Sequence, residues 1–116
     1  TYEFEALLMV RTATTTVNPR VGLAWPTGLT DGVASIQEAQ SATAQLLSNG
    51  NINAALLVAV GGLPNTTQSW PVRVRGLVRA GATPNGDVRI QLASETAGTT
   101  VRIVARSHLK YRTLAF

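Results

Sequence analysis

A short pattern, in which an arginine stands between two aliphatic residues, recurs through the last third of the chain. It occurs in residues 72–79, 88–90 and 101–103. Successive side chains of a β-strand point to opposite faces, so each run predicts a strand with aliphatic side chains on one face and arginines on the other. Such strands form antiparallel sheets that cover a core with one face and expose the second. The residues predicted to face the core are Val72, Val74, Val78, Val88, Ile90, Leu92, Val101 and Ile103.

The rest of the chain predicts further short strands separated by turn-forming residues. Residues 36–47 contain helix-favouring side chains with poor apolar spacing, so a loop with one helical turn is expected there. Asn49 and Gly50 together are a strong turn signal, and proline–glycine clusters predict turns at residues 26–28 and 84–87. About eight strands with little helix are typical of an antiparallel β-sandwich or jelly roll. The expected strands are residues 2–11, 20–25, 33–38, 54–60, 70–80, 88–95, 100–106 and 109–114.

Composition limits the classes of protein to which the chain can belong. Its 116 residues are 45% apolar, which is enough for one domain, residues 1–116, to bury a core without disulfides or metal. The chain has no cysteine, so a disulfide framework and a cysteine-based zinc site are excluded. The longest apolar stretch, near residues 54–60, is too short to cross a bilayer, and we expect no membrane insertion.

Charge is distributed unevenly along the sequence. Residues 1–71 contain two basic and four acidic residues, whereas residues 72–116 contain eight basic and two acidic residues. Such a block usually forms a solvated face, and the alternative is contact with an anionic partner. Nine of the ten cations are arginine, which favours bidentate contacts with carboxylate or phosphate. The residues predicted to form this anionic-partner face are Arg73, Arg75, Arg79, Arg89 and Arg102.

The first predicted strand, residues 2–11, is apolar on one face throughout and on part of the other. Leu7 and Met9 interrupt the second face, which begins with Glu3 and Glu5. Either a neighbouring subunit or a loop of the same chain would cover these two residues. Under the first interpretation the subunit interface contains Leu7 and Met9, together with Tyr2 and Tyr111 near the two chain ends.

Both tryptophans precede a proline, Trp25 before Pro26 and Trp70 before Pro71. At a junction between strand and loop, an indole either closes the end of a sandwich or stacks on a sugar ring. Nucleic-acid binding is not expected, because the strands that carry arginine place aliphatic residues, not aromatic ones, between the cations.

The inventory of reactive side chains does not favour catalysis. His108 is the one histidine, and no Gly-x-Ser-x-Gly motif is present for a nucleophile. Glu3 and Glu5 lie about 7 Å apart on one strand face, where carboxylates are usually solvated rather than set across a cleft. We therefore expect no enzyme, no cofactor and no metal site.

Both ends of the chain carry a resemblance to a known class of proteins. The segments YEFEALLMVRT (residues 2–12), RVGLAWP (20–26), LASE (92–95) and SHLKYR (107–112) resemble small virion proteins of tailed bacteriophages. The resemblance covers about half of the chain and leaves the centre unconstrained. It implies a jelly roll like that of tumour necrosis factor, assembled as trimers on heads, tails or fibres. The chain departs from the family at Arg106, where glycine would be expected for a tight turn.

Pattern and resemblance together predict an all-β, antiparallel sandwich of jelly-roll type that forms a homotrimer in a virion. Its partners would be further copies of itself and other virion proteins, met through the arginine face. The alternative is a receptor-binding or glycan-binding tip module of a phage fibre, in which Trp25 or Trp70 stacks on host surface sugar.

Overall fold

The computed structural model describes residues 1–14, 16, 17, 19–39, 45–51, 56–59 and 67–115. Within these residues the chain forms strands and no helix, so the all-β prediction is confirmed. The strands are β1 (Tyr2–Thr12), β2 (Pro19–Ala24), β3 (Thr27–Ala39), β4 (Gln45–Asn51), β5 (Leu56–Ala59), β6 (Trp70–Asn85), β7 (Arg89–Ser94), β8 (Val101–Ile103) and β9 (His108–Thr113).

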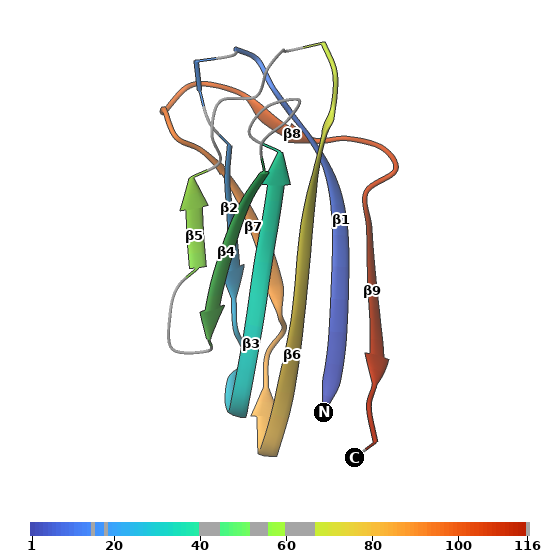
Figure 1. Ribbon diagram of the computed structural model, residues 1–116. Helices are drawn as coiled ribbons and strands as arrows, with labels where there is room; N and C mark the ends of the chain where they lie inside the picture. Colours follow the sequence, from blue (N-terminus) through green and yellow to red (C-terminus); the bar gives the residue numbers. More distant parts are fainter. Residues whose placement is uncertain (15, 18, 40–44, 52–55, 60–66, 116) are drawn as a thin grey trace.

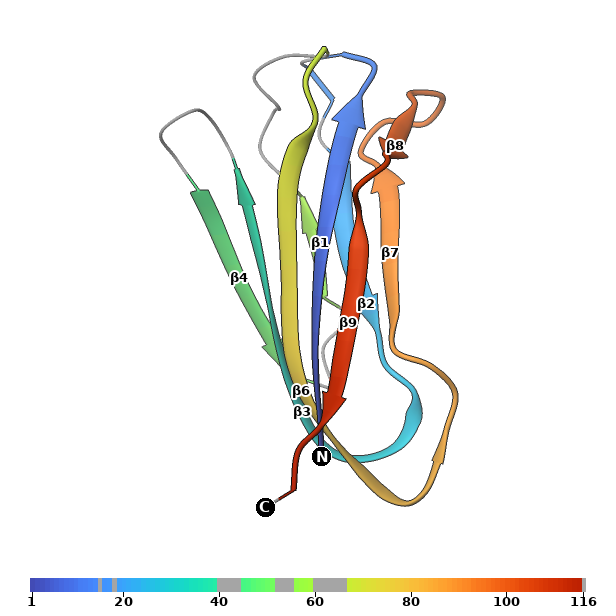
Figure 2. The same cartoon turned by 90° about the vertical axis from the view of Figure 1, so that its right-hand side faces the viewer.

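Two antiparallel sheets of unequal width form a β-sandwich (Figure 1 and Figure 2). The larger, sheet A, has the order β4-β3-β6-β1, and the far edge of β1 pairs with β9 along its first half and with β8 at its end. The smaller, sheet B, has the order β5-β2-β7. Both ends of the chain lie at the same end of the sandwich, where the Leu114 amide donates to the Thr1 carbonyl at 2.8 Å.

Strict alternation in β1 explains how the strand joins the core. Phe4, Ala6, Leu8 and Val10 are buried, and the residues between them are only partly covered. Ala6 and Leu8 lie opposite Val74 and Val72 of β6, which are also buried. Burying such side chains contributes roughly 1.5–3 kcal/mol each, so the pairing of β1 with β6 holds the centre of the sandwich together.

The two strands also fit each other at a glycine. Gly76 lies opposite Phe4, and a Cβ at that position would overlap the Phe4 ring and the Val33 carbonyl. The ring therefore occupies the space that a side chain on β6 would need. This close approach explains why the series of inward valines on β6 is interrupted at residue 76.

Not every residue predicted to face the core is equally buried. Val88, Ile90, Leu92 and Val101 pack against the core while keeping partial exposure. Ile103, by contrast, is 48% exposed, because β8 is a short strand at the edge of sheet A. Sheet B has three strands, so it does not cover the whole width of sheet A.

Local signals for a turn and for helix were both wrong in β3 and β4. Asn49 and Gly50 lie inside β4, opposite Ser35 and Ala34 of β3, and do not form a turn. Residues 37–39 continue β3 and residues 45–47 begin β4, so the expected helical turn is absent from the described part of residues 36–47. Pairing with a neighbouring strand outweighs local propensity at both places.

Four described residues have positive φ, and two of them, Gly28 and Arg106, bear on the sequence predictions. Gly28, with φ of 75°, lies where the pairing of β3 with β6 shifts register, so the predicted turn at residues 26–28 becomes a bulge within the strand. Arg106 also has φ of 75°. Among the described residues it is the one residue other than glycine with positive φ. The chain thus makes a left-handed turn between β8 and β9 at a residue that has a Cβ atom, where glycine would be free of strain.

Candidate binding surfaces

The face of sheet A that points away from sheet B brings together most of the residues predicted to bind partners. We call it the outer face. Directly opposed residues of paired strands share a face, so the register sets its side chains in rows across the sheet. The rows are Val33–Leu77–Glu3–Arg112, Ser35–Arg75–Glu5–Lys110 and Gln37–Arg73–Leu7–His108, and Asp31 and Arg79 continue them toward the end of β6.

Aliphatic residues are exposed on the outer face beside these charges. Val33 is 52% exposed, Leu77 directly opposite it is 41% exposed, and Leu47 on β4 is 61% exposed. Leu7 and Met9, which the sequence singled out, lie on the same face and are half-buried. Sequence reasoning missed Val33, Leu47 and Leu77, which a correct alternation for β3, β4 and β6 would have identified.

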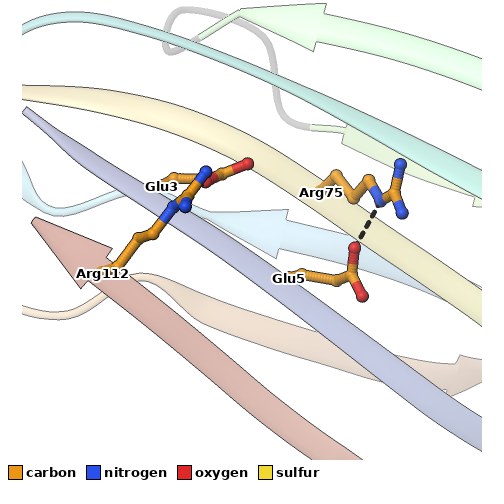
Figure 3. A network of polar contacts seen from close by, with 4 residues as sticks. All are labelled: Glu3, Glu5, Arg75 and Arg112. Carbon is orange, nitrogen blue, oxygen red and sulfur yellow. Dashed lines mark hydrogen bonds and ion pairs between the residues drawn. The ribbon is translucent and has the colours of Figure 1, made fainter. Parts of the chain in front are cut away.

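Ion pairs across strands neutralise part of the charge on the outer face. Figure 3 shows Glu5 of β1 accepting a hydrogen bond from Nε of Arg75 at 2.5 Å, and Glu3 lying beside Arg112 of β9, with which it also forms an ion pair. The hydrogen bond from Arg75 holds the pKa of the Glu5 carboxyl below its ordinary value, and the nearby charges of Arg73 and Lys110 act in the same direction. Both pairs are solvent-exposed, so each contributes little to stability and more to the register of the strands.

The five arginines predicted to form one cationic face do not lie on one face. Arg73, Arg75 and Arg79 line the outer face along β6, and Arg102 lies on the same face, opposite Arg11 at the end of β1. Arg89 belongs to β7 of sheet B, on the opposite side of the sandwich, 3.7 Å from Asp87. Alternation shows whether a side chain points inward or outward, but it does not show which sheet the strand joins.

The four residues predicted at a subunit interface are also divided between two surfaces. Leu7 and Met9 lie on the outer face, whereas Tyr2 and Tyr111 lie on the other side of sheet A, at its β1–β9 edge. Tyr111 is 78% exposed and Leu109 on the same strand is 59% exposed, because sheet B does not extend over β9.

A cleft of about 520 Å³ opens beside these residues, between β9 and the start of β7. Most of its lining is apolar, and Asp87 is the one charged residue there. The lining residues are Tyr2, Phe4, Pro26, Leu29, Val78, Ala80, Pro84, Gly86, Asp87, Val88, Ile90, Leu109 and Tyr111.

Both tryptophans pack against the core from the ends of the sandwich. The Trp25 ring meets the Phe4 ring edge to face, with centroids 6.2 Å apart. Its indole nitrogen is buried and has no hydrogen-bond partner among the described residues. Trp70 lies opposite Val10 at the other end of β1. These placements are those expected of residues that close the ends of the sandwich.

Sequence reasoning also missed a buried carboxylate, Glu38. Its side chain is 1% exposed and points into the sandwich at the end of β3, opposite Val72. Neither carboxylate oxygen has a hydrogen-bond partner among the described residues, and burial raises the pKa of Glu38 from 4.5 to about 7. The available signal was positional, since Glu38 continues the inward series of Ala34 and Ile36 along β3.

The described residues contain no group of three His, Asp or Glu side chains that could hold a metal ion. His108 is exposed on β9, and Glu3 and Glu5 are engaged by arginines. No helix in the described part of the chain is long and apolar enough to cross a membrane.

Comparison of the chain with family models, curated proteins and solved structures gave no match.

Proposed function

We propose that the chain is an assembly module that binds copies of itself through the outer face of sheet A and forms a homotrimer. The observation that carries this proposal is the exposure of Val33 and Leu77, directly opposed at the centre of a sheet face. When a second copy covers an exposed aliphatic pair, apolar surface is removed from water, and this favours association. Closed symmetric oligomers are the usual outcome for such surfaces.

The setting we propose is the virion of a tailed bacteriophage, as a decoration, fibre or tail component. The support for it is the resemblance of both chain ends to small virion proteins, which also implies a jelly-roll relationship between the two sheets. In that setting the charged residues around Val33 and Leu77 would select partners and set register more than they add affinity.

Light scattering coupled to size exclusion tests self-association. We expect the wild-type chain at micromolar concentration to have a mass near three times its 12.2 kDa. The double variant Val33→Asp, Leu77→Asp should be monomeric, because it places carboxylates in the centre of the contact.

Leu109→Asp is the matched control, since it makes the same chemical change at an exposed leucine on the other side of sheet A. It should remain trimeric. A monomeric wild type, or a double variant with unchanged mass, would contradict the proposal.

A further inference from the structure

Among the described strands, β9 is paired along one edge only. One of its edges pairs with β1, and no described strand pairs with the other. All six of its residues are exposed. Roughly half of its backbone N–H and C=O groups therefore point away from the sheet, which is the arrangement that accepts an added strand.

The two sides of this edge differ chemically. On the outer face β9 presents His108, Lys110 and Arg112 at alternate positions. On the other side it presents Leu109 and Tyr111, which line the apolar cleft described above. A strand added here would meet cations with one set of its side chains and an apolar cleft with the other.

Charge decides between the candidate occupants of this edge. An antiparallel pair of β9 strands from two copies would set Lys110 and Arg112 against the same cations of the other copy, and opposed like charges destabilise a sheet. The sequence contains no acidic residue after Glu95 that could offset this repulsion. Lysine on a free edge is a common protection against such self-pairing.

Strand β1 already shows which pattern fits β9. It sets Glu3 opposite Arg112 and Glu5 opposite Lys110, with Phe4 and Ala6 on the side of the core. Arg112 forms its ion pair with Glu3, whereas Lys110 forms none among the described residues. A second acidic and apolar strand at the free edge would repeat this arrangement.

We propose that the free edge of β9 binds an extended segment of a partner protein in which acidic and apolar residues alternate. The segment adds as a further strand of sheet A, directs its carboxylates to Lys110 and Arg112, and places its apolar side chains in the cleft beside Tyr111. This surface is the edge of the sheet, so the binding is distinct from self-association through Val33 and Leu77.

Three synthetic peptides test the proposal by calorimetry and by amide chemical shifts of β9. The first alternates valine and glutamate, the second alternates valine and lysine, and the third is the first with a central proline. We expect the first to bind and to shift the β9 amides. The lysine peptide should bind roughly tenfold more weakly or not at all, because its charges repel β9. The proline peptide should also lose binding, because proline cannot complete the ladder.

Charge reversal on the protein completes the test. The variant Lys110→Glu, Arg112→Glu should lose affinity for the glutamate peptide and gain affinity for the lysine peptide. The control Arg89→Glu, Arg102→Glu makes the same change in net charge away from β9 and should keep the wild-type preference. Lys110→Glu alone preserves the Glu3–Arg112 pair and should shift the preference in the same direction. Equal losses in both double variants, or full binding of the proline peptide, would overturn the proposal.

Discussion

At the scale of single residues, Glu38 carries the largest unfavourable interaction that we identify. Its carboxylate is buried opposite Val72 without a hydrogen-bond partner among the described residues, so the neutral form is favoured and the pKa rises to about 7. A carboxyl whose pKa is raised on folding binds a proton more tightly in the folded chain than in the unfolded one. The stability that proton binding by Glu38 contributes is therefore fully present below pH 4.5. It is lost as the pH rises through about 7.

We predict that Glu38→Gln removes this pH dependence. The amide resembles the protonated acid in shape and does not ionise, so the variant should match the wild type near pH 4.5. At pH 8 it should be more stable by on the order of 2–3 kcal/mol. Urea unfolding at several pH values measures the difference. The control Glu95→Gln makes the same change at an exposed position and keeps Glu38, so its stability should fall with pH over the same range as that of the wild type. A wild type and Glu38→Gln with parallel pH profiles would disprove the prediction.

At the scale of elements, the turn between β8 and β9 is held by a residue with an unfavourable backbone conformation. Arg106 has φ of 75°, which costs a residue with a Cβ atom roughly 1–2 kcal/mol. The turn persists because both of its flanks are tied to β1. The Val104 amide donates to the Met9 carbonyl at 2.9 Å, and the Met9 amide donates to Oγ of Ser107, also at 2.9 Å.

We predict that Arg106→Gly raises the free energy of unfolding by about 0.5–1 kcal/mol, because glycine adopts this φ without strain. Arg102→Gly, four residues earlier within β8, should have the opposite sign and lower stability by a similar amount, since glycine weakens a strand. Midpoints of urea unfolding with unchanged slopes measure both effects. A loss of stability in Arg106→Gly as large as that in Arg102→Gly would show that the turn is not strained.

The elements also show where sequence reasoning succeeds. Alternation located β1 and β6 because apolar residues recur at every second position, such as Phe4, Ala6 and Leu8 in β1 and Val72 and Val74 in β6. Sequence reasoning failed at Asn49 and Gly50, where the pairing of β4 with β3 outweighs the turn preference of the two residues. It also missed Glu38, which lies within the expected strand 33–38 at an inward position, because a carboxylate is not expected in the core.

At the scale of the whole molecule, the assignment of strands to sheets was not predictable from periodicity. The chain passes repeatedly between the two sheets, so Arg89 on β7 and Arg75 on β6 lie on opposite sides of the sandwich despite similar local sequences. Long-range pairing sets that assignment, and it also leaves β9 and its apolar side chains beyond the cover of sheet B. The candidate surfaces were thus predictable residue by residue, but not as connected faces.

The same long-range pairing leads to a prediction about unfolding. Strands β1 and β6 run side by side along most of the molecule, whose longest dimension is 45 Å. Trp25 contacts Phe4 near one end of this pair, and Trp70 lies opposite Val10 at the other end. Because both indoles report on the same two strands, we expect the two ends of the sandwich to unfold in one cooperative transition.

Single-tryptophan variants measure this directly. In Trp70→Phe the remaining fluorescence reports on the end with Phe4, and in Trp25→Phe it reports on the end with Val10. Each substitution changes stability by itself, so the fluorescence midpoint of each variant is compared with its own midpoint from far-ultraviolet circular dichroism. We expect the two midpoints to coincide in both variants. A fluorescence transition that precedes the loss of strand signal in only one variant would show that this end of the sandwich opens independently, and that β1 and β6 do not couple the two ends.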